Sequence, residues 1–188
     1  MRVLFLDIDG VLNSEVTFKK QHFKQGEWRK KKPTRGSELE RKYVRQLRRI
    51  VRRTSCKIVL SSSWRGTERK TKNSPLHKLL AEYGMEIYDY TGPTLGCRGY
   101  EIQEWLDRHS DVTNIVILDD DDDMLHLSKY LVKTKFNNCN YQKWGRFALG
   151  IGEGLTRKKA SEAIKMLKKK EYINIYAIKD KRNFRKHF

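Results

Sequence analysis

Acidic and hydroxyl side chains follow directly after three short apolar segments of this 188-residue chain. Asp7 and Asp9 end the first segment, in VLFLDIDGVLN. The sequence SSSWR, residues 61–65, follows the second, and a run of five aspartates at 119–123 follows the third. Arg98 stands between the second and third, at the start of a helical pattern. These residue types, brought together, could bind a metal ion and an anion.

A metal site is expected if the three apolar segments are neighbouring strands, because four or more carboxylates then converge. Like charges at close range repel strongly at low dielectric, so such a cluster needs a counter-charge. Oxygen ligands with no histidine nearby favour Mg²⁺ over zinc. The hydroxyls of Ser61 and Ser62 and the guanidinium of Arg98 could then hold an anion against the metal. A phosphate suits all three partners.

Each motif taken alone also has a purely structural interpretation. A D-x-D at a strand end is often only a turn, and Arg98 alone is usually a surface arginine. Trp64 is expected in the core or as a platform under Arg65. If the extended chain continues past Asp7, strand alternation places Asp7 and Asp9 on one side, with Gly10 permitting a sharp turn after them.

Strands and helices alternate along the segments that position these residues. We predict helices over 37–54, 74–84, 99–109 and 156–170, the first with Ser37 and Glu40 as a capping box. We predict strands over 2–7, 57–61, 114–120 and 130–134, with a short extended piece over 85–90. The strands are continuous apolar runs, which is typical of a parallel sheet covered on both faces. The order predicts an α/β fold, whose ligands bind at the carboxyl ends of the strands.

The motifs in this order resemble those of the haloacid dehalogenase (HAD) superfamily of phosphohydrolases. DIDGVLN, LSSSWR, RGYEI, ILDDDDD and GLT are similar to the HAD domain of Swiss-army-knife RNA-repair-type and phage proteins, over roughly residues 1–167. The resemblance implies a HAD-like Rossmannoid three-layer sandwich with a central parallel sheet and a minimal cap. It also implies a Mg²⁺-dependent phosphomonoesterase that works through an aspartyl-phosphate intermediate.

The resemblance further implies a role for individual residues. Asp7 would be the nucleophile, Asp9 the general acid and base, and Arg98 would replace the lysine usual in the superfamily. Ser62, with Ser61 close behind, would bind a phosphate oxygen.

Further residues are expected around the substrate and the metal. We place Gly10, Ser63 and Arg65 at the substrate. The Mg²⁺ ligands would be Asp7, the backbone carbonyl of Asp9, Asp119 and Asp120, whereas 121–123 fit equally well as a solvated helix start.

The domain prediction is one HAD-like phosphatase domain over 1–170, followed by an edge strand and a basic tail over 171–188. We expect residues 14–36 to form a basic flap, which is too short for a cap domain and would leave the site open to a phosphate on a macromolecule. The flap and tail carry many cations: Lys19, Lys20, Lys24, Arg29, Lys30, Lys31, Lys32 and Arg35, then Lys179, Lys181, Arg182, Arg185 and Lys186. Phe18, Phe23 and Trp28 interleave with the flap cations, as base-stacking platforms do.

The formal net charge of +18 favours a polyanionic partner. We therefore expect a phosphorylated nucleic acid, as in end repair, or a nucleotide as substrate. Two alternatives remain open: a HAD phosphatase of small metabolites, and a non-catalytic nucleic-acid-binding module on a HAD scaffold. Cys56, Cys97 and Cys139 fit reduced thiols, and no apolar stretch approaches the ~20 residues of a membrane span. These features predict a cytoplasmic protein with no membrane partner.

Overall fold

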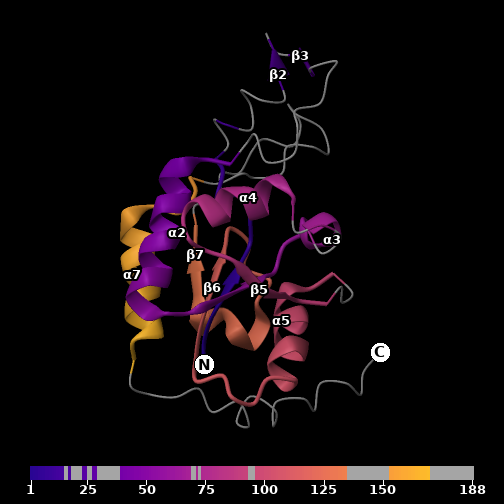
Figure 1. Ribbon diagram of the computed structural model, residues 1–188. Helices are drawn as coiled ribbons and strands as arrows, with labels where there is room; N and C mark the ends of the chain where they lie inside the picture. Colours follow the sequence, from indigo (N-terminus) through magenta and orange to yellow (C-terminus); the bar gives the residue numbers. More distant parts are fainter. Residues whose placement is uncertain are drawn as a thin grey trace.

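The centre of the molecule is a five-stranded, all-parallel sheet in the order β5–β4–β1–β6–β7 (Figure 1). The computed structural model describes residues 1–14, 17, 23–24, 27–28, 39–68, 71, 73–92, 96–134 and 153–169. The strands are β1 (Arg2–Leu6), β4 (Lys57–Leu60), β5 (Ile87–Tyr90), β6 (Asn114–Asp119) and β7 (Leu131–Lys133). The predicted α/β class is confirmed, and each predicted strand lies within about two residues of the observed one.

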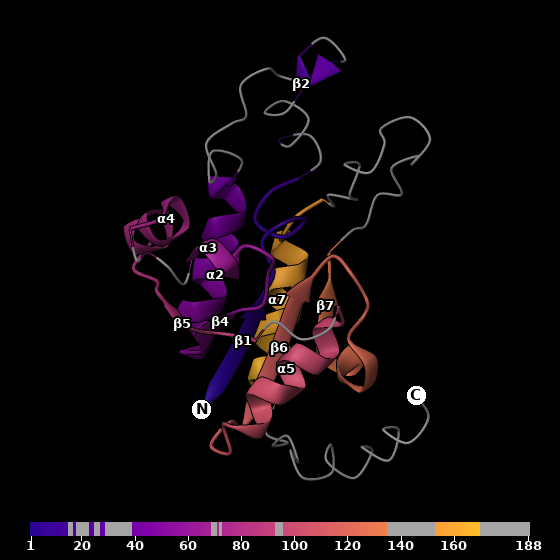
Figure 2. The same ribbon diagram turned by 90° about the vertical axis from the view of Figure 1, so that its right-hand side faces the viewer.

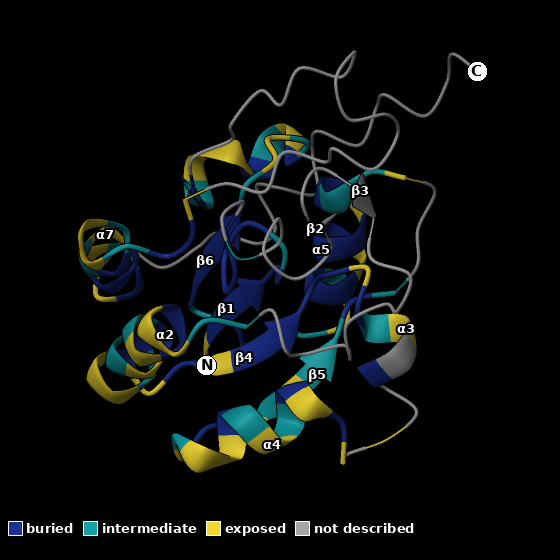
Figure 3. Cartoon of the chain, turned by 90° about the horizontal axis from the view of Figure 1, so that it is seen from above, coloured by how far each residue is buried: buried dark blue, intermediate teal, exposed yellow. Residues whose placement is uncertain are grey.

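Helices cover both faces of the sheet and make three layers, as predicted (Figures 2 and 3). One face packs against α2 (Arg41–Thr54), α4 (Pro75–Glu82) and α7 (Arg157–Leu167). The other packs against α5 (Arg98–Asp107) and the 3₁₀ helix η1 (Leu125–Tyr130).

Alternation along β1 assigns its side chains to these two layers. Leu4 and Leu6 join the core beneath α2 and α7, whereas Val3 and Phe5 join the core beneath α5. All four side chains are fully buried. Burial of each such side chain contributes about 1.5–3 kcal/mol to folding, which anchors β1 as the central strand.

The start of α2 differs from the prediction. The helix begins at Arg41 with Glu40 as its N-cap residue, so the expected start at 37 is wrong, and Ser37 itself lies outside the described residues. Glu40 is bound elsewhere: its backbone N–H donates to the Leu12 carbonyl (2.8 Å) and its carboxylate accepts from Ser14 Oγ (2.5 Å). These contacts attach the start of α2 to the loop after β1.

Hydroxyl side chains cap the N-termini of two other helices. The hydroxyl of Ser74 accepts from the His77 N–H, and Pro75 occupies the first turn of α4. Thr156 caps α7 by accepting from the Lys159 N–H. The short helix α3 (Arg65–Glu68) and η1 were not predicted.

Several predicted segments lie wholly or mostly outside the described residues: most of the 14–36 flap, the 171–188 edge strand and tail, and Cys139. Within the range 14–36, β2 (Phe23–Lys24) and β3 (Glu27–Trp28) pair as antiparallel strands. Cys56 and Cys97 are free thiols. No helix within the described ranges is long and apolar enough to cross a membrane.

Candidate active site

The sheet register brings the ends of β1, β4 and β6 side by side. Leu6 pairs with Leu60 on one side and with Leu118 on the other. The Ser61 N–H then donates to the Leu6 carbonyl (2.8 Å), and the Asp7 N–H donates to the Leu118 carbonyl (2.9 Å). The predicted convergence of the strand-end motifs is therefore observed.

Strand alternation explains why the polar residues at these ends share one side of the sheet. Asp7, Ser61 and Asp119 each lie two residues beyond a member of the core under α5, namely Phe5, Val59 and Ile117. All three side chains therefore point toward the helical layer that contains α5, whose first residue is Arg98.

Three carboxylates form a compact cluster at this edge. One oxygen each from Asp7, Asp119 and Asp120 lies within 4.8 Å of the others, and Asp7 and Asp119 are buried. Burial, followed by the charge of Asp119, raises the pKa of Asp7 well above its usual range, even though Arg98 and a hydrogen bond from Ser62 lower it. Burial also raises the pKa of Asp119 to about 6, against the effect of Arg98. For Asp120, burial and the charge of Asp119 raise the pKa to about 7.

These residues fit a hard divalent cation. Asp119 Oδ2 is buried and accepts no hydrogen bond from the described residues, although Arg98 Nε lies 3.3 Å away. Three closely spaced carboxylates with an unsatisfied oxygen are a donor set that a cation such as Mg²⁺ would neutralise. The side chain of Asp9 is not part of this cluster.

Arg98, the first residue of α5, faces the cluster. Its Nη2 lies 3.3 Å from Asp7 Oδ1, while its Nε approaches Asp119. The backbone N–H of Arg98 donates to Asp123 Oδ2 (2.8 Å), which fixes the start of the helix beside the aspartate run. The arginine is thus placed to neutralise negative charge next to Asp7.

Glu101 connects Arg98 to Arg65. Its Oε2 lies 3.4 Å from Arg98 Nη1, and its Oε1 accepts from Arg65 Nη2 (2.6 Å). Arg65 also donates to the Ser62 carbonyl (3.1 Å). Arg65 therefore links the serine segment, residues 61–63, to α5. Its contact with the substrate stays a prediction.

Asp9 is held by two side-chain donors. Its Oδ1 accepts from Asn13 Nδ2 and its Oδ2 from Trp64 Nε1, each at 2.9 Å. Asn13 Oδ1 in turn accepts from the Gly10 N–H (2.8 Å). The strand ends at Leu6 and Asp9 already lies in a turn, so alternation does not place Asp9 beside Asp7. The two hydrogen bonds fix its carboxylate instead.

Gly10 is required by the close approach of Asp120. Its φ of +74° lies in the left-handed region, and a Cβ built there would meet Asp120 Cγ at 2.4 Å. Only glycine satisfies both demands without displacing a carboxylate of the cluster.

The three serines after β4 lie in different environments. The buried Ser61 Oγ has no hydrogen-bond partner among the described residues, which leaves a donor at the site. Ser62 is fully buried; its Oγ accepts from the Trp64 N–H (3.4 Å) and hydrogen-bonds to Asp7. Ser63 is exposed. Ser61 and Ser62 are therefore better placed than Ser63 to meet a bound phosphate.

Sequence reasoning missed two residues of this arrangement, Asn13 and Glu101, and the contact of Trp64 with Asp9. Trp64 is buried in the core, as one prediction had it, but its indole N–H serves Asp9. A signal was present, because Asn13, Trp64 and Glu101 lie within the motifs DIDGVLN, LSSSWR and RGYEI, and Asn and Trp side chains can donate to a carboxylate.

A comparison with protein-family models gives one finding that bears on this geometry. The model described as the HAD domain in Swiss Army Knife RNA repair proteins matches residues 3–138. No curated protein and no solved structure gave a significant match to the chain. The matched range contains each of the site residues described above.

Proposed function

The chain belongs to the family of HAD domains found in Swiss Army Knife RNA repair proteins, and on this premise we propose that it removes phosphate from the ends of nucleic acids. The reaction is that of a Mg²⁺-dependent phosphomonoesterase with an aspartyl-phosphate intermediate on Asp7. One observation carries the proposal: the buried Asp7 carboxylate lies 3.3 Å from Arg98 Nη2 and has an oxygen within 4.8 Å of carboxylate oxygens of Asp119 and Asp120.

The first step transfers the phosphoryl group to Asp7. An Asp7 oxygen forms a bond to phosphorus while the bond between phosphorus and the leaving oxygen breaks. Asp9 gives its proton to that oxygen, held in place by Asn13 and Trp64. Arg98 and the hydroxyls of the serine segment bind the remaining phosphate oxygens.

The second step hydrolyses the acyl phosphate. Asp9, now a carboxylate, accepts a proton from a water molecule whose oxygen attacks phosphorus. The bond between phosphorus and Asp7 breaks, which releases inorganic phosphate and restores both carboxyl groups.

Magnesium would be held by Asp7, Asp119 and Asp120, with the Asp9 carbonyl as the further ligand expected from the family. When bound, the ion neutralises the repulsion among these carboxylates and withdraws charge from the phosphate. With the ion bound, Asp7 would be ionised despite the burial that raises its pKa.

The substrate is proposed from the family description and from charge. The description names RNA repair proteins, and the chain carries a net charge of +18. A polyanion bearing a terminal phosphate satisfies both observations.

A phosphate-release panel tests this proposal. The substrates are 3′- and 5′-phosphorylated RNA and DNA oligonucleotides, mononucleotides and sugar phosphates, each assayed with Mg²⁺ or EDTA. We expect Mg²⁺-dependent release from at least one class of oligonucleotide, abolished in Asp7→Asn. The matched control is Asp122→Asn in the same acidic run, because Asp122 is exposed and pairs with Lys133. Release from sugar phosphates alone would indicate a metabolite phosphatase. No release from any substrate would refute the proposal that the chain is a phosphatase.

A further inference from the structure

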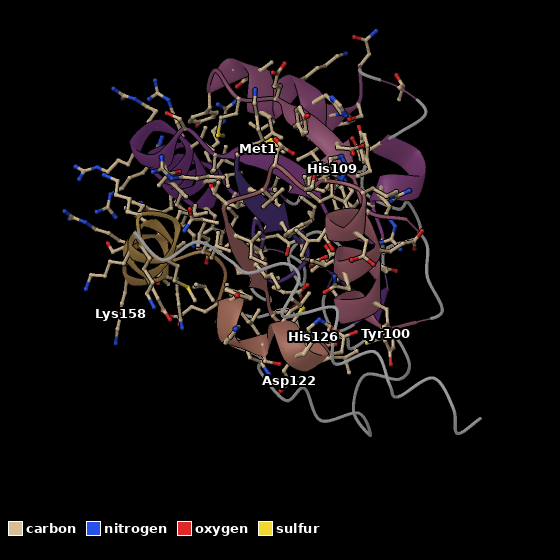
Figure 4. The ribbon with its side chains drawn as sticks, turned by 90° about the horizontal axis from the view of Figure 1, so that it is seen from below. Met1, Tyr100, His109, Asp122, His126 and Lys158 are labelled. Atoms are coloured by element: carbon tan, nitrogen blue, oxygen red, sulfur yellow. The ribbon has the colours of Figure 1, made fainter. Side chains whose placement is uncertain are left out.

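The helices α2 and α7 carry a large excess of positive charge. α2 contains seven lysines and arginines and no acid, and α7 contains four and one acid. On the opposite face of the sheet, α5 contains one arginine and three acids. Positive charge is thus segregated to one helical layer, from which Lys158 projects outward in Figure 4.

The two helices form one surface. They pack side by side, and Arg49 of α2 donates to the Arg157 carbonyl (3.3 Å) and to Ser161 Oγ (3.0 Å) of α7. Several cations nearby are already paired, such as Lys159 with Glu162. We call the following exposed residues the basic face: Arg45, Arg52, Arg53, Lys158 and Lys165.

No carboxylate in the described part of the chain lies within ion-pair distance of a basic-face residue. On α2, Arg45, Arg52 and Arg53 fall on one side because they are spaced seven and eight residues apart. On α7, Lys158 and Lys165 repeat the spacing of seven. The charges therefore form two neighbouring rows that a regular polyanion can follow.

Both helices begin next to the loop after β1, at the edge of the sheet that carries the candidate active site. The chain enters α2 through the Glu40 N–H, which donates to the Leu12 carbonyl, and enters α7 through the Leu155 N–H, which donates to the Val11 carbonyl; both distances are 2.8 Å. Leu12 and Val11 lie in the turn that follows Asp7 and Asp9. From this edge α2 extends for 14 residues, or about 20 Å.

We propose that the basic face binds the phosphate backbone of the nucleic acid whose terminal phosphate occupies the site. This inference rests on the proposed function and names the surface that selects a polymer over a mononucleotide. A stacked strand rises about 3.4 Å per nucleotide, so about six nucleotides reach from the site edge of α2 to its far end.

Binding of oligonucleotides of two to twelve nucleotides tests the inference. The assay is fluorescence anisotropy over a range of NaCl concentrations in an Asp7→Asn background, which cannot consume the ligand. We expect the dissociation constant to fall with length up to about six nucleotides and then to level off.

A triple variant, Arg45→Gln with Arg52→Gln and Lys158→Gln, removes three of the five positive charges of the basic face. Each lost contact with a single strand lowers the slope of log K against log salt by about 0.7, so three lower it by about 2. At 0.1 M salt this corresponds to binding about 100-fold weaker. In an otherwise unmutated protein, kcat/KM for the oligonucleotide should fall relative to that for p-nitrophenyl phosphate.

The matched control removes three exposed cations elsewhere, through Lys57→Gln, Arg108→Gln and Lys129→Gln. An equal loss in both triple variants would overturn the inference, because net charge alone would then explain binding. Dinucleotide binding as tight as that of a twelve-nucleotide strand would also overturn it, as would equal binding to phosphatidylserine vesicles. Length-dependent binding by a protein that releases no phosphate would instead refute the proposed function and support nucleic-acid binding by the basic face.

Discussion

Substitution of Trp64 by phenylalanine removes one of the two side-chain donors that hold Asp9. The indole N–H donates to Asp9 Oδ2 at 2.9 Å, and the rest of the side chain is buried in the core. Phenylalanine keeps most of the apolar packing and has no N–H. The substitution thus tests the orientation of Asp9, the proposed general acid, apart from the integrity of the fold.

The size of the effect follows from the type of hydrogen bond. Asp9 becomes a carboxylate as it gives its proton to the leaving oxygen, and a hydrogen bond to a charged acceptor contributes about 1.5–3 kcal/mol. Because about 1.36 kcal/mol corresponds to a factor of ten in rate, the expected loss of kcat is about 10- to 150-fold. This loss applies to substrates whose leaving oxygen must be protonated, such as a nucleotide hydroxyl.

The assay compares leaving groups under saturating substrate. The p-nitrophenolate ion departs with little need for a proton, so we expect Trp64→Phe to slow p-nitrophenyl phosphate hydrolysis much less than oligonucleotide dephosphorylation. Trp105→Phe is the matched control, because Trp105 is also buried and its N–H donates to Asp89 (2.6 Å) in another part of the fold. An equal loss on both substrates, or no loss on either, would refute the role of Trp64 in positioning Asp9.

Three further predictions follow from the site. Gly10→Ala should lower both the free energy of unfolding and the affinity for Mg²⁺. Gly84 shares the positive φ but has open space around it, so Gly84→Ala should lower only the free energy of unfolding, by about 1–2 kcal/mol. Urea denaturation measures the stability and metal titration measures the affinity. Glu101→Gln should lower the unfolding free energy by about 1–3 kcal/mol and reduce kcat, because both arginines lose a charged partner. Between about pH 4 and pH 7 the metal-free folded chain holds protons on Asp119 and Asp120 that the unfolded chain releases, so the free energy of unfolding should fall as the pH rises. Because Mg²⁺ must displace these protons, it should raise the melting temperature more at pH 8 than at pH 5.5.

Each of these predictions has an outcome that contradicts it. Equal effects of the two glycine substitutions on Mg²⁺ affinity would mean that the contact with Asp120 is unimportant. For Glu101, the control is Glu104→Gln on the same helix, and an equal loss of kcat in both variants would point to a general effect of charge. A Mg²⁺-induced rise in melting temperature that is independent of pH would show that protons and metal do not compete for the aspartates.

Local patterns in the sequence were sufficient to predict most of the fold. Continuous apolar runs such as that over 114–120 identify strands covered on both faces, and the predicted helices over 74–84 and 156–170 lie within about three residues of α4 and α7. The start of α2 was mispredicted because Glu40 binds Ser14, 26 residues earlier in the chain. Contacts of that kind depend on how the loop after β1 packs, which local pattern does not reveal.

The candidate site was likewise predictable in part: the convergence of its carboxylates was, and the partners of its other side chains were not. The motifs predicted that the carboxylates of Asp7 and Asp119 would converge, because both end apolar strands. The pairings that hold the other groups join residues distant in sequence: Trp64 lies 55 positions from Asp9, and Glu101 lies 36 positions from Arg65. These partners become visible only once β4, β1 and α5 are placed relative to one another.

The most direct measurement of the central claim is chemical capture of the phosphorylated enzyme. An oligonucleotide with a ³²P-labelled terminal phosphate is mixed with the protein and Mg²⁺, quenched in acid within milliseconds, and the protein is digested and sequenced by mass spectrometry. We predict a hydroxylamine-sensitive label on Asp7, absent in Asp7→Asn and in EDTA. Steady release of phosphate with no label on the protein, or a label on any other residue, would contradict it.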